Sequence, residues 1–225
     1  MTSRSCEAFK GGRGKLTALD SSLRMLEYVK RIQALAQSGL AYSDNRYDVE
    51  RYEELRSISV EMAALIADTP VEKIRGLFNG EEGYQTPKLD VRGVILRDGR
   101  MLFVREKIDG FWTLPGGWAD IGLGPRENVI KEVREEAGLD VAPIRLLAVI
   151  DKKFHPHPPS PWHTWKLFIL CADSGGVPRP GPETLNARFF GPDEIPRLSL
   201  TRITPGQVEM MFRLSRDGSG EVLFD

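Results

Sequence analysis

The chain has 225 residues, 28% of them charged, and a formal net charge of −1, which is ample for one large domain or two small ones. This balance argues against a surface that coats nucleic acid or a membrane, and no apolar run approaches the roughly 20 residues that span a bilayer. With only Cys6 and Cys171, a disulfide framework is not expected, so we predict a cytoplasmic protein that binds neither DNA nor membranes.

The N-terminal segment, residues 1–20, is polar, Gly-rich and basic. It lacks the apolar stretch of a secretory signal, so we interpret it as a flexible tail. Residues 21–80 are predicted to form a small helical domain. Its first helix carries a stripe at helical spacing that Gly39 can end; the stripe consists of Met25, Val29, Ile32 and Ala36.

A second apolar stripe predicts a second helix, and its members are Tyr52, Leu55, Ile58, Met62 and Leu65. Thr69 to Glu72 then combines an N-cap, a proline at the first helical position and a capping-box glutamate. We expect a third short helix there that ends near Gly80. Two roles stay open for this helical domain: it packs or dimerises, or it contributes to substrate selection.

From Lys88 the pattern changes to strands. Two apolar runs flank Asp98-Gly99, a pair that is typical of a tight hairpin turn. Leu146–Ile150 and Trp165–Cys171 are predicted to be further strands. Strands interrupted by a few helices indicate an α/β or α+β sandwich, which we place at residues 86–216, followed by a C-terminal tail at 217–225.

An acidic helix is predicted over Gly124–Ala137, with Pro125 in its first turn and Gly138 as its left-handed cap. At about 100° per residue, three carboxylates fall within one arc: Glu132, Glu135 and Glu136. The opposite face is apolar, with Val129, Ile130, Val133 and Ala137. Clustered carboxylates repel one another, and hard cations such as Mg²⁺ or Mn²⁺ relieve that repulsion. The alternative is a solvated surface helix.

The segment before this helix favours the metal interpretation. Trp112 to Gly117 forms a tight turn with two glycines after a strand. Glycine allows the backbone to approach a ligand closely, and a free carbonyl in this turn could complete a metal site.

The stretch Gly117–Leu139 resembles the Nudix box, which is a glycine, a loop, and then Arg-Glu-apolar-x-Glu-Glu-x-Gly-apolar. Here the second part is Lys131-Glu132-Val133-Arg134-Glu135-Glu136-Ala137-Gly138-Leu139. Two positions depart from the pattern. Leu123 stands in place of the first glutamate of the box, and Lys131 in place of its arginine, so the planar two-pronged contact of an arginine is absent.

Three other segments resemble one Nudix subgroup: Gln37–Tyr42, Gly116–Asp120 and His155–Pro161. That subgroup carries an N-terminal helical domain and is described as acting on X-linked nucleoside diphosphates. It includes CDP-choline pyrophosphatases and ADP-ribose pyrophosphatases, and Leu123 and Lys131 are ordinary variants in it. The resemblance implies a Nudix α/β/α sandwich with a mixed sheet, preceded by a small N-terminal helical domain, and a homodimer.

The resemblance also implies a metal site for Mg²⁺ or Mn²⁺, formed by Glu132, Glu135, Glu136 and the Gly117 carbonyl. A glutamate is then expected to deprotonate the attacking water. Glu132 is favoured if this base lies in the box, and Glu183 if it comes from a distant loop; the alternative for Glu183 is an exposed loop acid.

Five residues are predicted to bind substrate. Arg92 and Arg105, on the two hairpin strands, suit phosphate contacts, although both could simply face solvent. Trp118 and Asp120 lie in the loop ahead of the acidic helix, where they can meet the substrate. His157 belongs to a proline-stiffened loop that we interpret as the rim of the pocket or as a rigid surface loop. Zinc is not expected there, because no cysteine accompanies the histidines.

The predicted reaction is attack of water on one phosphorus of a nucleoside diphosphate linked to a group X. The products are a nucleoside monophosphate and phosphorylated X, and among substrates CDP-choline is narrowly favoured over ADP-ribose. Two alternatives remain. One is removal of nucleotides from RNA ends, although a basic groove is lacking. The other is a nucleotide-sensing regulator that has lost catalysis, which the departures at Leu123 and Lys131 suggest.

Overall fold

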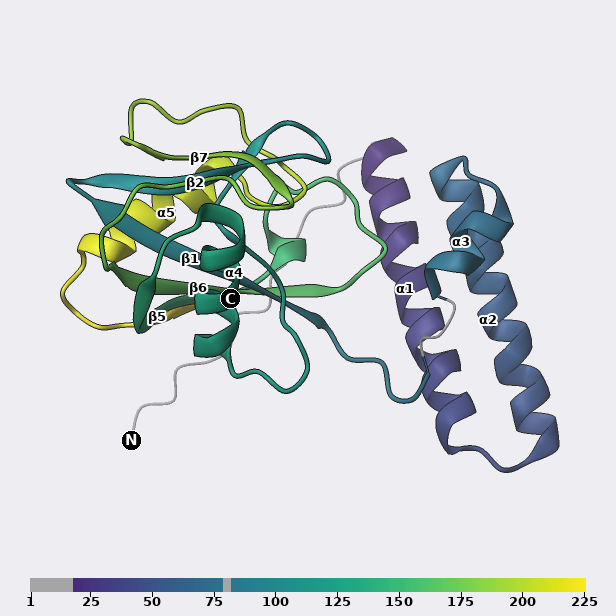
Figure 1. The fold of residues 1–225 in the computed structure, drawn as a ribbon. Coiled ribbons are helices and arrows are strands. Elements are labelled where there is room, and N and C mark those ends of the chain that lie inside the picture. Colours follow the sequence, from purple (N-terminus) through teal and green to yellow (C-terminus); the bar gives the residue numbers. More distant parts are fainter. Residues whose placement is uncertain (1–17, 79–81) are drawn as a thin grey trace, which may run out of the picture. The chain divides into compact units, whose positions relative to one another are not determined.

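The computed structural model describes residues 18–78 and 82–225, and the chain divides into two compact units, Met1–Gln85 and Thr86–Asp225 (Figure 1). Of the flexible tail predicted for residues 1–20, residues 1–17 lie outside the described part of the chain. Gly80, near which the third helix was expected to end, also lies outside it. Among the described residues, none of the helices combines the length and apolar character that crossing a bilayer requires.

The N-terminal unit contains the helices α1 (Ala18–Tyr42), α2 (Arg46–Ala67) and α3 (Val71–Phe78) (Figure 1). A short turn joins α1 to α2, and the Asn45 side chain caps α2 by accepting from the Tyr47 amide at 2.9 Å. The apolar stripes in the sequence therefore located α1 and α2, and the capping signature at Thr69 to Glu72 located α3.

Gly39 does not end α1, which continues to Tyr42. A Cβ atom at Gly39 would lie 2.4 Å from the Tyr52 ring of α2. The prediction at Gly39 was wrong because this glycine serves close packing between two helices rather than helix termination.

Most of the apolar stripe predicted on α2 does not face α1, although Tyr52 of that stripe packs against Gly39. The buried positions of α2 are instead small or β-branched: Ser59, Val60, Ala63 and Ala64. Leu55 and Ile58 are exposed, and Leu65 is 83% exposed. The smaller side chains let α1 and α2 approach each other closely, and the larger apolar ones are left on the surface.

The second unit begins with the predicted hairpin of β1 (Lys88–Arg97) and β2 (Arg100–Glu106). Asp98 and Gly99 have φ angles of 50° and 76°, as the two central residues of a type I′ turn require. The hairpin prediction is confirmed down to its two turn residues.

Six further strands complete the unit: β3 (Trp112–Thr113), β4 (Gly116–Trp118), β5 (Val141–Asp151), β6 (Thr164–Asp173), β7 (Thr184–Phe190) and β8 (Leu223–Phe224). Their order is β3-β2-β1-β6-β5-β8, with β4 paired to β1 and β7 paired to β2. The pairs β1–β6 and β5–β8 are parallel and the others antiparallel. The sheet is therefore mixed, as expected, and β8 comes from the segment predicted as a C-terminal tail.

Helices α4 (Pro125–Ala137) and α5 (Pro205–Arg216) cover opposite faces of these strands, and a short 3-10 helix, η1 (Lys152–Phe154), follows β5 (Figure 1). Alternation along β1 sends Val91 and Ile95 into the core under α4 and Val94 into the core under α5. The result is an α/β/α sandwich, which confirms the predicted fold class.

Candidate functional site

The acidic helix α4 forms as predicted. The Gly124 amide donates to the Glu127 side chain at 2.7 Å at its start, and Gly138 takes the left-handed conformation at its end, with φ 65°. Its three glutamates differ in burial. Glu136 is 7% exposed, whereas the side chains of Glu132 and Glu135 are 13% and 54% exposed. The carboxylates thus form a gradient from the interior to solvent.

Glu136 is fixed by the predicted glycine turn. Its Oε2 accepts a hydrogen bond from the Gly116 amide at 2.7 Å. Gly116 has a φ of 140°, and a Cβ there would lie 2.0 Å from the Val91 carbonyl oxygen. This turn therefore requires glycine for its conformation and for its approach to β1.

Gly117 lies beside Glu132. A Cβ at Gly117 would meet Glu132 Oε2 at 3.1 Å, so the glycine leaves room for this carboxylate. The pairing of β4 with β1 and the packing of α4 beside β4 bring three groups together. These are the backbone of Gly117 and the side chains of Glu132 and Glu136.

Lys131 occupies the centre of the exposed carboxylates. Its Nζ lies 2.9 Å from Glu135, 3.1 Å from Asp120 and 3.5 Å from Glu132. Hydrogen bonds to Glu135 and then to Asp120 raise the pKa of Lys131. Three carboxylates from the loop and the helix therefore already converge on one positive charge.

This donor set is made of hard oxygen atoms, which suit Mg²⁺ or Mn²⁺. As the side chains stand, no three carboxylate, histidine or cysteine groups within residues 18–78 and 82–225 are arranged to hold a metal ion. A divalent ion fits this site if it takes over the place of the Lys131 ammonium, which already attracts the same oxygens.

The buried glutamates carry an electrostatic cost. Burial raises the pKa of Glu136 to about 7, and the charges of Glu106 and Glu132 act in the same direction against Arg92 and the Gly116 amide. The pKa of Glu132 is also raised, mainly by burial. A cation among these carboxylates would relieve that cost.

Glu106, at the end of β2, is a site residue that the sequence did not reveal. It is buried, and its carboxylate forms an ion pair with Arg202 at 3.0 Å. Burial raises its pKa, and the charges of Arg202 and Arg92 oppose that rise. Because the charge of Glu106 raises the pKa of Glu136, we group Glu106 with the same acidic site. Its only sequence signal was an acid directly after an apolar strand.

Arg92 lies behind the site rather than on its surface. It is 3% exposed. Its Nε and Nη2 donate to Asp90 at 2.6 and 3.2 Å, and Nη1 donates to the Leu114 carbonyl at 3.0 Å. All three guanidinium nitrogens are thus engaged by the protein, in contrast to the free fork that a phosphate contact would need. Arg105 is exposed and donates from Nε to the Gly110 carbonyl at 2.7 Å.

Trp118 and Asp120 are exposed in the loop before α4. The Asp120 amide donates to the Asn128 side chain at 2.8 Å, and the Asp120 carboxylate pairs with Lys131. This loop is therefore anchored to the acidic helix, and the Trp118 ring is free to contact another molecule.

Both ring nitrogens of His157 are engaged by the protein: Nδ1 lies 2.7 Å from the Leu200 carbonyl and Nε2 lies 2.9 Å from Gln207 Nε2. Burial lowers the pKa of His157 to about 4. The neutral ring donates to Leu200 and accepts from Gln207, so it fastens its loop to α5. A rigid loop, one of the two interpretations, describes these contacts better than a substrate contact does.

Glu183 immediately precedes β7 and is exposed. Its backbone carbonyl accepts from the Lys107 amide at 3.1 Å, whereas no hydrogen bond or ion pair to its carboxylate occurs in the part of the chain that the structure describes. Because β7 pairs Thr184 with Glu106 and the Glu183 carbonyl bonds to Lys107, the backbone of Glu183 lies beside the end of β2 that carries Glu106.

Comparison with known proteins identifies both units. Residues 24–78 match a family described as a UDP-X-like, N-terminal oligomerisation domain, and residues 87–214 match the NUDIX domain. Over 202 residues the chain is 49% identical to the putative ADP-ribose pyrophosphatase YjhB of Bacillus subtilis (strain 168), covering 90% of this chain and 97% of that protein.

Two solved structures are also similar. A UDP-X diphosphatase is 32% identical with a TM-score of 0.58, covering 90% of this chain and 98% of that one. An ADP-ribose pyrophosphatase from Streptococcus suis 89-1591 is 42% identical with a TM-score of 0.57, covering 62% of this chain and 100% of that one.

Proposed function

The chain belongs to the NUDIX family and is a pyrophosphohydrolase, and we propose that its substrate is a nucleoside diphosphate joined to a second group X. Water attacks one phosphorus atom, and the pyrophosphate bond breaks to give a nucleoside monophosphate and phosphorylated X. The observation that carries this proposal is the convergence of Glu132, Glu135 and Asp120 on one cation beside the buried Glu136.

Glu132, Glu135, Glu136 and the Gly117 carbonyl are the proposed ligands of Mg²⁺ or Mn²⁺. When bound, such an ion would neutralise phosphate oxygens and lower the pKa of the attacking water. The protein contributes the positions of these groups: the Gly116 amide orients Glu136, and Gly117 leaves space for Glu132. Lys131 has to release its carboxylates for this arrangement to form.

The names of the relatives bear on the identity of X. Two of them are called ADP-ribose pyrophosphatases, one only putatively, which favours ADP-ribose over the CDP-choline that the sequence alone favoured. Trp118 is proposed to stack on the nucleobase, Asp120 to contact the substrate once Lys131 has moved, and Arg105 to contact the diphosphate.

The decisive experiment is turnover of ADP-ribose, CDP-choline and a UDP-sugar with Mg²⁺ or Mn²⁺, with the nucleoside monophosphate as the readout. We expect ADP-ribose to give the highest kcat/KM. Tight binding of one compound without turnover of any would instead indicate a nucleotide-sensing regulator. Release of a nucleotide from RNA ends alone would move the substrate to RNA.

Glu183 is proposed as the general base, because its backbone lies beside the end of β2 that carries Glu106, and no described residue forms a hydrogen bond or ion pair with its carboxylate. Glu183→Gln is expected to lower kcat by about 10²- to 10⁴-fold, the usual contribution of a general base, without weakening Mn²⁺ binding. Asp193→Asn, at another exposed acid close to β7, is the control and should leave kcat unchanged. An unchanged kcat in Glu183→Gln would assign the base to Glu132.

The helical unit is proposed to join two copies into a homodimer, since it matches an oligomerisation domain and leaves large apolar side chains of α2 exposed.

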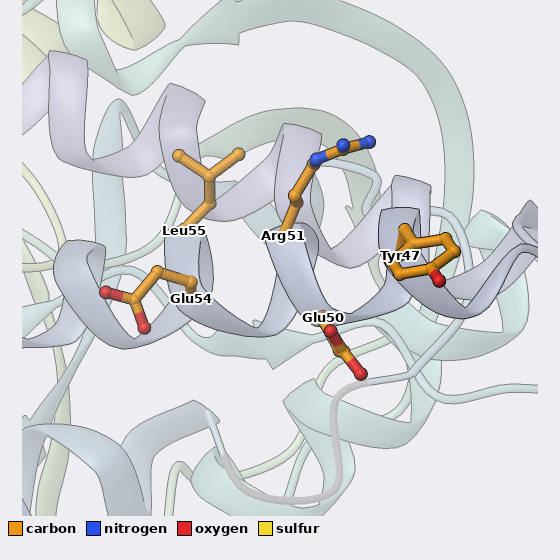
Figure 2. Close-up of a pocket in the computed structure, with 5 residues that line it drawn as sticks. All are labelled: Tyr47, Glu50, Arg51, Glu54 and Leu55. Carbon is orange, nitrogen blue, oxygen red and sulfur yellow. The ribbon is translucent and has the colours of Figure 1, made fainter.

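A surface pocket on α2 is lined by residues of this single helix, namely Tyr47, Glu50, Arg51, Glu54 and Leu55 (Figure 2). Such a one-helix hollow suits a second helix better than a nucleotide. Light scattering is expected to give twice the 25.2 kDa of one chain; a monomer at micromolar concentration would contradict the proposal.

A further inference from the structure

Three charged side chains are buried together in β1 and β6. Asp90, Arg92 and Lys166 are 8%, 3% and 0% exposed. Asp90 accepts from Arg92 and, at 2.7 Å, from Lys166 Nζ. Buried charges are costly unless they are compensated, and this cluster holds two cations but only one anion.

Arg92 also supports the glycine turn. Its Nη1 donates to the Leu114 carbonyl, and the neighbouring Gly93 amide donates to the Pro115 carbonyl at 2.8 Å. The next residue, Gly116, donates to Glu136. The guanidinium thus holds the turn two residues before the amide that orients the buried glutamate.

On the basis of the metal-dependent function proposed above, we propose that Asp90 and Lys166 are positioning residues that hold Arg92 behind the metal-binding glutamates. Asp90 engages the guanidinium through two nitrogens, and Lys166 fixes the second oxygen of Asp90. Arg92 can then hold the Leu114 carbonyl, and with it the turn whose Gly116 amide orients Glu136. Without Asp90, Arg92 would lose two of its three hydrogen bonds, and its hold on the glycine turn that orients Glu136 would loosen.

The test is a titration of the metal-free full-length protein with Mn²⁺, in which electron paramagnetic resonance measures the concentration of the free ion. Asp90→Asn, which keeps the side-chain volume, is expected to raise the Kd for Mn²⁺ by about tenfold, in the range seen when groups that orient metal ligands are removed. The KM for ADP-ribose at saturating Mn²⁺ should change less than twofold. Lys166→Met should also raise the Kd for Mn²⁺. Lys166→Arg, which keeps the positive charge, should have the Kd of the wild type.

Arg97→Met is the matched control, because it breaks the ion pair of Arg97 with Asp173 at the other end of the same strand. Its Kd for Mn²⁺ should equal that of the wild type. Circular dichroism of each metal-free variant precedes the titrations. If Lys166→Met does not fold, Asp90→Asn and Lys166→Arg decide the question.

A double-mutant cycle separates positioning from general destabilisation. In an Arg92→Met background, Asp90→Asn should weaken Mn²⁺ binding no further, because Asp90 acts through Arg92. Additive losses, or an unchanged Kd in the single Asp90→Asn variant, would overturn the inference. If the wild type hydrolyses a substrate, either of these results overturns only the role of Asp90 and Lys166. If the wild type binds Mn²⁺ but hydrolyses none of the compounds, the proposed function alone is refuted.

Discussion

Glu136→Gln is expected to lower kcat by about a thousandfold or more, which corresponds to about 4 kcal/mol of lost transition-state stabilisation. The substitution removes the negative charge of the most buried carboxylate on α4. It keeps an oxygen that can still accept the hydrogen bond from the Gly116 amide, so the turn is retained. The measurement is kcat with ADP-ribose at saturating Mg²⁺.

Stability of the metal-free variant shows that the loss is chemical rather than structural. The pKa of Glu136 lies at about 7 in the folded protein and at 4.5 as its ordinary value. The stability from the protonated carboxyl is therefore fully present below pH 4.5 and is lost as the pH rises through 7. Because glutamine stays neutral, the variant should melt above the wild type at pH 8 and with it at pH 4.

Glu209→Gln makes the same change at an exposed position of α5. It should alter neither kcat nor the difference in melting temperature between the two pH values. A Glu136→Gln variant with wild-type turnover would remove Glu136 from the metal site.

Gly116→Ala is expected to lower the free energy of unfolding by about 2 to 6 kcal/mol. A φ of 140° is strained for alanine and costs about 1 to 3 kcal/mol, and the clash of its Cβ with the Val91 carbonyl adds overpacking of about the same size. Urea unfolding of the metal-free protein measures the change.

Gly122→Ala separates the two causes. Gly122 also has a positive φ, 89°, but a Cβ there would meet nothing within 4 Å. Its loss should be limited to about 1 to 3 kcal/mol of backbone strain. Equal losses at the two positions would show that the contact with β1 is unimportant.

Local patterns predicted the elements that depend on neighbouring residues. Asp98-Gly99 specified the hairpin because both turn residues must have positive φ. The acidic helix followed from its proline, its apolar face and Gly138, which cap and orient it without help from distant segments. The apposition of the glycine turn and the glutamates followed from the box spacing.

Residues whose roles depend on distant segments were missed. Gly39 resembled a helix end, but the ring of Tyr52 decides its role. Arg92 resembled a surface strand residue because its partner Asp90 is buried together with Lys166, which lies 76 positions from Asp90 and is brought beside it by the parallel pairing of β1 and β6. Glu106 carried only the weak signal of an acid after an apolar run, since its partner Arg202 comes from the segment before α5.

Lys131 gives the proposed metal site an internal competitor. The ammonium is tethered to the helix that carries the glutamates, so its effective concentration at the carboxylates is high whatever the ionic composition outside. A divalent ion can bind only to those molecules in which the Lys131 ammonium has moved away from the carboxylates. This requirement weakens the apparent affinity of the site for the ion. Occupancy should therefore rise at a higher metal concentration than the bare carboxylates would set, and hydrolysis should respond to changes in free Mg²⁺ or Mn²⁺ in that range.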